Sequence, residues 1–193
     1  MFFGGKDPVH RVMDRLVKKL KKLEIPHAVV GGMAVLAHRY RRTTNDVDVL
    51  LTREGFERFC KKFVPKDYDR IDGRPRRFRD RKYEVSFDVL ISGMFPGSGQ
   101  PGPISYPDPA DVCQLIDDVS VIDLPTLIQL KLAARRYQDF ADVVNLIRAN
   151  ELDESFQAKL HPSLHRDYIE CVDECRREEE YERRQDEQMS EEG

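Results

Sequence analysis

The sequence predicts an α/β (α+β) protein in which strands and helices mix in the first two thirds and helices alone follow. Apolar residues recur at helical spacing near the N-terminus, alternate with polar residues over 83–92, and return to helical spacing after residue 122. We therefore expect a mixed α/β core over 1–122, a C-terminal helical region over 123–178 and a charged, disordered tail over 179–193.

Length and composition fit a soluble globular chain. The 193 residues suffice for one domain with a helical appendage, and 40% of them are hydrophobic. The net charge of −3 says little about partners, because basic residues cluster early and acidic ones late. No apolar run approaches the roughly eighteen residues of a membrane span, and the N-terminus lacks the apolar region of a signal peptide. We expect a cytoplasmic protein without membrane contact.

The first elements alternate between helix and strand. A helix over 8–23 has one apolar face and one basic face, which we interpret as solvent-facing, with a nucleic-acid surface as the alternative. A short strand over 27–32 leads into a helix over 32–40. A second strand, over 46–51, follows an Arg- and Thr-rich link.

The middle of the chain contains one helix and one clear strand. Thr52 is placed to cap a helix over 53–63. The segment 66–82 is strongly positive and predicts a turn or irregular hairpin. Strict alternation then predicts a strand over 83–92, with apolar residues on one face and Glu84, Ser86 and Asp88 among the residues on the other.

The rest of the chain is a loop, a hairpin and helices. Proline and glycine are dense over 93–109, which predicts a loop, and the segment 112–124 predicts a hairpin that turns at Asp117-Asp118. The helices that follow are expected over 125–137, 139–149, 153–160 and 163–180.

Two aspartates stand in an otherwise apolar strand. Asp46 and Asp48 leave the same strand face about 6.6 Å apart, while Val47, Val49 and Leu51 point the other way, into a core. Two unpaired carboxylates there repel each other and lose hydration. A divalent cation removes both costs, and Mg²⁺ prefers one or two carboxylates together with phosphate oxygens.

A third carboxylate lies on another strand. Asp88 joins the pair if the two strands are neighbours, and three such carboxylates can hold two Mg²⁺ ions about 3.5–4 Å apart for phosphoryl chemistry. One ion would hold a triphosphate and the other would lower the pKa of an attacking hydroxyl, with Asp88 as the proton acceptor. Glu84, two residues away on the same face, is the competing candidate.

A glycine pair ends the first strand. Gly31 and Gly32 let backbone N–H groups approach an anion at the start of a helix, so a triphosphate can lie between them and the aspartates. Alone, a glycine pair is often a turn and two spaced aspartates are often a surface pair. The glycine pair, the two spaced aspartates and a third aspartate on a later strand, in this order, indicate a phosphate and metal site far more specifically than either motif alone.

These motifs resemble a known family. The segment over residues 29–51, VVGGMAVLAHRYRRTTNDVDVLL, resembles the signature of the polymerase-β-like nucleotidyltransferase superfamily. The link RRTTNDVDV resembles the bacterial AbiEii-like and minimal nucleotidyltransferase branches, some of whose members are toxins of toxin–antitoxin pairs. A second segment, LPTLIQLKLAARRYQDFADVVNLI, resembles the Lys-x₃-Arg-x₃-Asp-x₂-Asp helix segment of the same branch. Together the two segments extend the resemblance over residues 25–149.

The resemblance implies a nucleotidyltransferase fold, a mixed sheet flanked by helices and followed by a C-terminal helical bundle. It also implies two Mg²⁺ ions and a nucleoside triphosphate. Much of the superfamily has Ser where this chain has Gly32, and the hydroxyl of Thr43 or Thr44 is a candidate replacement. By position, phosphate contacts fall to Gly31, Gly32 and Lys131, and metal contacts to Asp46, Asp48 and Asp88.

The helix segment also has a physical interpretation. Lys131, Arg135, Asp139 and Asp142 step by four, four and three residues, which places them on one helix face. We expect Lys131 to meet phosphates, and Asp139 to orient Lys131 or Arg135. The alternative is a surface ladder of ion pairs.

Other polar residues are weaker candidates. Arg41 and Arg42 either meet phosphate or an acceptor, or complement the end of the preceding helix with His38 and Arg39. The Arg-rich segment 70–82 either holds an RNA acceptor or is a solvated loop.

The four cysteines are expected to be free thiols in a reducing compartment. Cys171 and Cys175, with His161 and His165, have spacings that suit either a metal site or one face of a helix, and the helix is the favoured interpretation.

The expected reaction is transfer of a nucleoside monophosphate from a triphosphate to an acceptor hydroxyl, with release of pyrophosphate. The acceptor is RNA, a protein or a small molecule, and a toxin role would bring an antitoxin partner. One alternative is an idle member that senses nucleotides or binds a partner. Another is an antibiotic-modifying transferase, which would need an acidic pocket, whereas the charge near this site is basic.

Overall fold

A computed structural model describes residue 5 and residues 7–191. Among these, the strands form one mixed seven-stranded sheet in the order β3-β4-β5-β2-β1-β7-β6. Neighbours β1 and β7, and β2 and β5, run parallel, and the other pairs are antiparallel. The strands are β1 (His27–Val30), β2 (Val47–Leu51), β3 (Tyr68–Ile71), β4 (Arg74–Asp80), β5 (Ser86–Ile91), β6 (Cys113–Ile116) and β7 (Val119–Ile122).

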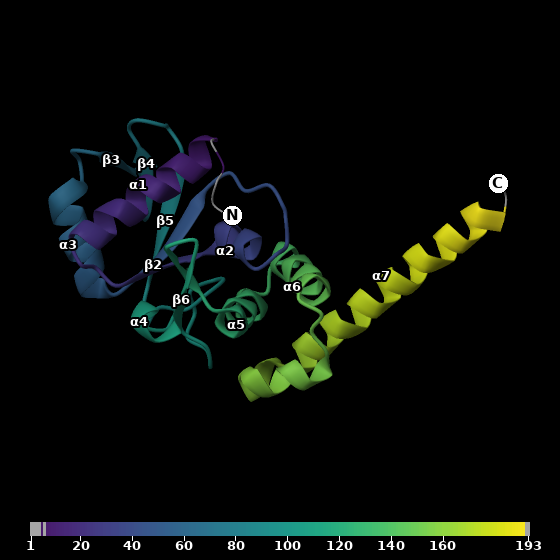
Figure 1. The fold of residues 1–193 in the computed structure, drawn as a ribbon. Helices are drawn as coiled ribbons and strands as arrows, with labels where there is room; N and C mark the ends of the chain where they lie inside the picture. The colour runs from purple at the N-terminus through teal and green to yellow at the C-terminus, as the bar shows by residue number, and fades with distance from the viewer. Residues whose placement is uncertain (1–4, 6, 192–193) are drawn as a thin grey trace.

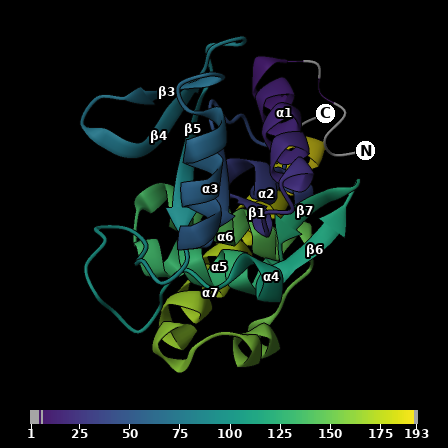
Figure 2. The ribbon, with the colours of Figure 1, turned by 90° about the vertical axis from the view of Figure 1, so that its left-hand side faces the viewer.

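Helices flank this sheet on both faces. Figures 1 and 2 place α1 and α3 on one face and α2, α5 and α6 beyond the other, with α7 extending away from the body. Thr52 caps α3 as predicted, by accepting from the backbone N–H of Gly55. The helices are α1 (Pro8–Lys22), α2 (Gly31–Ala37), α3 (Arg53–Phe63), α4 (Pro109–Val112), α5 (Leu124–Ala134), α6 (Tyr137–Ala149) and α7 (His165–Glu191), with 3₁₀ turns at Glu154–Lys159 and Pro162–Leu164.

The structure confirms the expected fold class, a mixed sheet with flanking helices and helices after it. The segment 66–82 is the β3–β4 hairpin, and the hairpin after it turns at Asp117 and Asp118, both with positive φ. Two adjacent left-handed residues match the twist that a tight two-residue hairpin turn requires.

Alternation along β2 and β5 separates a core from a polar face. Val47 and Val49 are buried and pair in register with Phe87 and Val89. Phe87 packs edge-on against Phe59 of α3, 6.0 Å between ring centroids. The aspartates of both strands therefore leave the opposite face, where α5 and α6 lie.

Two expectations about the C-terminal part were wrong. The segment after 178 is not a frayed tail, because α7 stays helical through Glu191; residues 192–193 lie outside the described part. Pairs such as Arg184–Glu180 and Arg183–Glu187 support it at helical spacing. Also, Lys131 and Asp139 do not share one helix, since the chain breaks between α5 and α6 at Arg135, which has φ 56°. Within the described residues, no helix is both long and apolar enough to span a membrane.

A buried ion pair joins α1 to the hairpin. Asp80 is fully buried at the end of β4 and accepts from Arg15 of α1 at 2.6 Å. The same carboxylate accepts from the backbone N–H groups of Lys82 and Tyr83. It therefore fixes both the helix and the turn into β5.

Asp80→Ala is expected to lower the free energy of unfolding by about 3 kcal/mol, because it leaves Arg15 and two N–H groups short of an acceptor. Urea denaturation measures this. Asp69→Asn is the control, because water screens the exposed Asp69–Arg81 pair and the pair should contribute little to stability. Equal losses in the two variants would contradict a structural role for Asp80.

Candidate functional site

A cleft of about 840 Å³ opens on the polar face of the sheet. That volume suits a nucleotide-sized ligand. The cleft lies between the start of α2, the strands β2, β4 and β5, the loop after β5, and the α5–α6 corner. Its charged lining residues are Asp46, Asp48, Asp88, Asp139, Arg42, Arg74, Arg76, Arg77, Arg136 and Lys131.

The glycine pair forms one wall because no side chain fits there. Gly31 has φ +59°, and a Cβ on it would lie 1.9 Å from Oδ2 of Asp48. A Cβ on Gly32 would lie 2.5 Å from Oγ1 of Thr44. A serine at 32 would therefore collide with Thr44, whose hydroxyl already lies beside this backbone, while Thr43 also lines the cleft.

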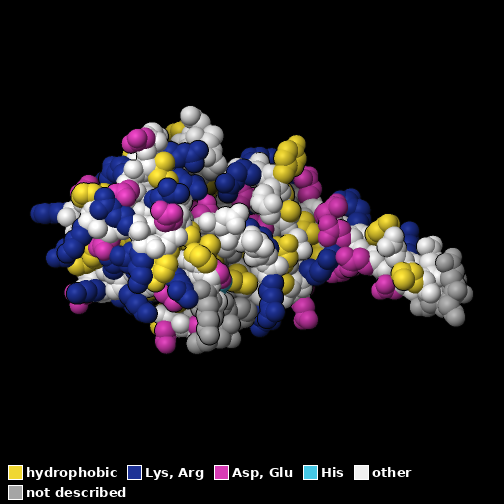
Figure 3. Space-filling view, turned by 90° about the horizontal axis from the view of Figure 1, so that it is seen from above, with side chains coloured by type: hydrophobic (Ala, Val, Ile, Leu, Met, Phe, Trp, Pro, Cys, Tyr) yellow, Lys and Arg dark blue, Asp and Glu magenta, His cyan; other side chains and the backbone are white. Residues whose placement is uncertain are grey.

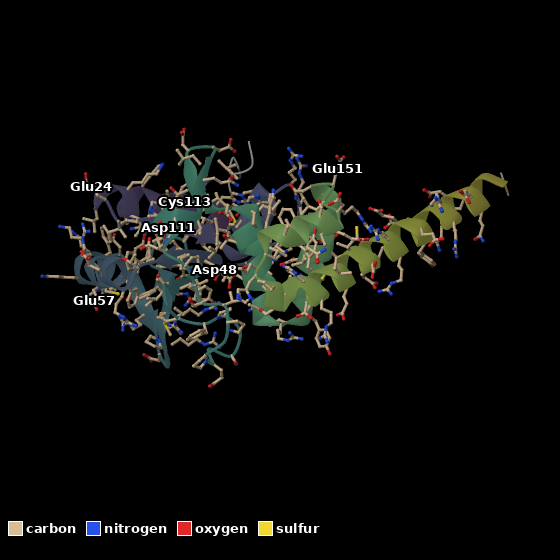
Figure 4. All side chains as sticks on the ribbon, turned by 90° about the horizontal axis from the view of Figure 1, so that it is seen from below. Glu24, Asp48, Glu57, Asp111, Cys113 and Glu151 are labelled. Atoms are coloured by element: carbon tan, nitrogen blue, oxygen red, sulfur yellow. The ribbon has the colours of Figure 1, made fainter. Side chains whose placement is uncertain are left out.

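The three aspartates converge on the facing wall. Asp48 pairs in register with Val30 on one side and Asp88 on the other, and Asp46 directly precedes β2. Asp48 lies inside the molecule, near the junction of the sheet and the C-terminal helices (Figure 4). Burial, and then the negative charges of Asp46 and Asp88, raise the pKa of Asp48 to about 7.

Glu84 is not part of this group. Asp88 lies within β5, whereas Glu84 precedes the strand as an exposed residue with φ 57°. The expectation that Glu84 shares the face of Asp88 was therefore wrong, because β5 begins only at Ser86. Burial raises the pKa of Asp88 as well, against the opposing charge of Arg77.

The donor set of this wall fits a divalent cation. The wall has three carboxylates, and burial together with the charges of the other two raises the pKa of Asp48. Hard oxygen ligands of this kind suit Mg²⁺. In the structure, Arg77 donates to Asp88 at 2.7 Å and to Asp46 at 3.4 Å. With the side chains so placed, the described residues hold no group of three or more His, Cys, Asp or Glu arranged around a metal position.

A buried ionic network closes the other side of the cleft. Lys131 of α5 donates to Asp142 at 2.6 Å and to Asp139 at 3.2 Å, and all three are almost fully buried. Asp142 also binds Arg42 at 2.8 Å, and Asp139 binds Arg136 at 2.5 Å. Lys131 is thus both a cleft residue and a structural counter-charge, so its removal should lower the stability of the fold.

Several predicted site residues lie elsewhere. Arg135 is mostly exposed and pairs with Asp167 of α7 at 2.8 Å, so the next residue, Arg136, enters the cleft instead. His38 is buried and binds the carbonyl of Ile122. Arg39 and Arg41 do not line the cleft, whereas Arg42 does.

The histidine and cysteine spacing in the C-terminal region reflects local packing. His161 binds Ser163, and His165 binds the carbonyl of Leu160. Cys171 and Cys175 are buried free thiols on α7. Nothing within the described chain gathers these four side chains around a metal position.

The loop after β5 supplies an apolar wall that sequence patterns did not reveal. Its ends are joined by Tyr106, whose backbone binds Gly93 and Met94. Gly97 rests against the carbonyl of Ala134 at the end of α5, where a Cβ would come within 2.6 Å. Tyr106 and Phe95 line the cleft here and suit the flat face of a base.

This chain has similarity to known proteins only at the level of solved structures, among the comparisons made with families, curated proteins and structures. No protein-family model and no curated protein matches the sequence. Among solved structures, an antigenic nucleotidyltransferase-like protein from Paracoccidioides brasiliensis is 17% identical, with 87% of this chain and 93% of that chain covered and a TM-score of 0.48. JHP933 from Helicobacter pylori is 16% identical, with 78% and 70% covered and a TM-score of 0.46.

Gly31→Ala should destabilise the protein by at least about 1 kcal/mol more than Gly73→Ala. Both residues have positive φ, so both variants carry the backbone cost of a left-handed alanine, about 1–2 kcal/mol. Only Gly31 faces a carboxylate; Gly73 has open space around it. Urea unfolding of the two variants isolates the clash with Asp48, and equal losses would show that Asp48 moves aside freely.

Asp48→Asn should stabilise the protein at pH 8 in the presence of a chelator. Because the folded pKa of Asp48 lies above its ordinary value, its ionisation opposes folding, and this cost grows from about pH 4 to pH 7 and is constant above. We expect a gain of about 2 kcal/mol, on the scale of 1.4 kcal/mol per pH unit and reduced by partial solvent access. Thermal unfolding at pH 5 and pH 8 measures it, with exposed Asp111→Asn as the control. A loss of stability at pH 8 would contradict the repulsion.

Proposed function

We propose that this protein is a Mg²⁺-dependent nucleotidyltransferase that moves a nucleoside monophosphate from a triphosphate to an acceptor hydroxyl. The observation that carries the proposal is the in-register pair Asp48 and Asp88, with Asp46 directly before the same strand and Asp48 against the side-chain-free backbone of Gly31. Carboxylates beside helix-start backbone that carries no side chain suit a metal-bound triphosphate.

Each wall has a role in this proposal. Asp46, Asp48 and Asp88 would hold Mg²⁺, which supplies charge stabilisation at the phosphates and acidifies the acceptor hydroxyl. The acceptor oxygen bonds to the α-phosphorus, the bond to the β-phosphate oxygen breaks, and pyrophosphate leaves. Asp88 takes the hydroxyl proton.

The remaining cleft residues bind and orient the triphosphate. Gly31 and Gly32 offer backbone donors, and Thr44 offers a hydroxyl beside them. Lys131 and Arg136 supply positive charge from the α5–α6 corner.

The acceptor is inferred from charge. Basic side chains outnumber acidic ones around the cleft, which favours an anionic acceptor such as RNA over a polycationic antibiotic. Figure 3 shows Lys and Arg side chains spread over the part of the molecule that holds α1, α3 and the β3–β4 hairpin. The family resemblance adds two further possibilities to the proposal. The acceptor can be a protein, and the enzyme can be a cytoplasmic toxin with an antitoxin partner.

A second candidate function is nucleotide sensing without catalysis. The specific observation in its favour is Arg77, whose guanidinium contacts two of the three carboxylates. A site held permanently in this state would bind nucleotide without cation and would not turn over.

The deciding experiment is transfer of label. The protein is incubated with each triphosphate labelled at the α-phosphate, Mg²⁺ and a cell extract, and the macromolecules are then tested for label. Transfer is supported if labelling and pyrophosphate release require Mg²⁺. Both should vanish in Asp48→Asn and persist in Asp69→Asn. Triphosphate binding with no pyrophosphate from any nucleotide supports the sensor.

Asp88→Asn should lower the transfer rate by about 10²–10⁴-fold, because it removes the proton acceptor. Triphosphate affinity measured without Mg²⁺ should stay within a few-fold, since the glycine wall and the α5–α6 corner are untouched. Glu84→Gln, outside β5, is the matched control and should be nearly silent. Rates from pyrophosphate release and affinities from calorimetry separate the two effects, and an active Asp88→Asn would overturn the assignment.

A further inference from the structure

Arg77 stands at the centre of the carboxylate wall. It lies on β4 directly opposite Asp88 of β5 in the antiparallel register. Its Nη1 donates to Asp88 Oδ2 at 2.7 Å and its Nη2 donates to Asp46 Oδ2 at 3.4 Å. One guanidinium therefore bridges a carboxylate of β5 and a carboxylate directly before β2.

Neighbouring arginines on the same strand do not do this. Arg76 donates to the sulfur of Met94, and Arg79 donates to the carbonyl of Glu84. The bridge is thus a property of position 77 and its cross-strand partner, not a general result of the positive charge of β4.

The guanidinium of Arg77 partly neutralises the carboxylates that a metal ion would bind. A planar guanidinium with two donor nitrogens matches two carboxylates, and it offsets part of the repulsion among the three aspartates. Its single positive charge is half that of Mg²⁺, so it offsets less of the carboxylate charge than the ion would. The side chain is about one quarter exposed and lines the open cleft, which leaves it room to move.

We propose that Arg77 is a placeholder, a side chain that occupies Asp46 and Asp88 in competition with a divalent cation. When the cation and the triphosphate both bind, its guanidinium leaves these carboxylates and hydrogen-bonds to the triphosphate instead. The proposal rests on the proposed function. Phosphate oxygens offer the guanidinium an alternative two-pronged partner, so the nucleotide releases the carboxylates that the cation needs. Cation and triphosphate should then each tighten the binding of the other, and by the same factor.

The test is a Mn²⁺ titration of the full chain, with free Mn²⁺ followed by electron paramagnetic resonance. It is run with and without a triphosphate whose α–β bridge cannot be cleaved. Arg77→Ala should bind Mn²⁺ alone at least about tenfold more tightly than the unchanged protein, and Arg77→Gln should follow it. The triphosphate should strengthen Mn²⁺ binding several-fold less in these variants than in the unchanged protein.

Arg76→Ala is the matched control. It removes the same charge from the adjacent position of β4, and it should change Mn²⁺ affinity by less than about threefold. An equal gain in Arg76→Ala would show a general charge effect and overturn the placeholder. An unchanged or weaker affinity in both Arg77 variants, with folding verified by circular dichroism, would overturn it too.

The outcomes also separate this inference from the proposed function. If the unchanged protein binds Mn²⁺ with triphosphate but the Arg77 variants gain nothing, only the placeholder fails. If the unchanged protein never binds Mn²⁺ and the Arg77 variants do, Arg77 still competes with the cation, but its move to the triphosphate and the transferase assignment both fail. If no variant binds Mn²⁺ under any condition, both fail.

Discussion

The cleft depends on one cross-strand register. Val30, Asp48 and Asp88 are neighbours across three adjacent strands, so the end of β1 delivers the glycine backbone to the place where two carboxylates emerge. A slip of one residue would turn the aspartates into the core that Phe59 and Phe87 occupy and would expose valines in the cleft. The aromatic core on one face of the sheet therefore determines the chemistry on the other.

Uncompensated negative charge is the second constraint. Carboxylates that lie close together repel each other and destabilise the folded chain, and burial with the charges of Asp46 and Asp88 raises the pKa of Asp48. Arg77 offsets the charge from the sheet side. From the helical side, Lys131 and Arg136 are largely committed to Asp139 and Asp142, which leaves the anionic wall available for a cation.

Elements with strong local patterns could be predicted from the sequence. The apolar strand with spaced aspartates, the glycine pair, the capped helix after Thr52 and the hairpin at Asp117-Asp118 all carry their signals within a few residues. Arg135 was misplaced because a left-handed residue inside a helical pattern leaves no trace in apolar spacing. The end of α7 was missed because charge pairs, not burial, stabilise its last turns.

The role of Arg77 could not be predicted, since it depends on which strand lies beside β5. The β4 sequence is mostly charged and shows no alternation from which its pairing with Asp88 could be derived. The same holds for Asp142, which binds a residue one hundred positions earlier, Arg42. Long-range pairs of this kind are set by the tertiary fold.

The contact between Arg42 and Asp142 also bears on how the helical region relates to the core. Arg42 lies in the link between α2 and β2, four residues before Asp46, and its partner is a fully buried residue of α6. The C-terminal helices therefore hold the very segment that presents the first carboxylate, and they supply Lys131 and Arg136 to the same cleft. Whatever boundary is drawn near residue 122, the site needs both sides of it, because the part before it presents Asp46, Asp48 and Asp88 and the helices after it add Lys131 and Arg136 to the same cleft.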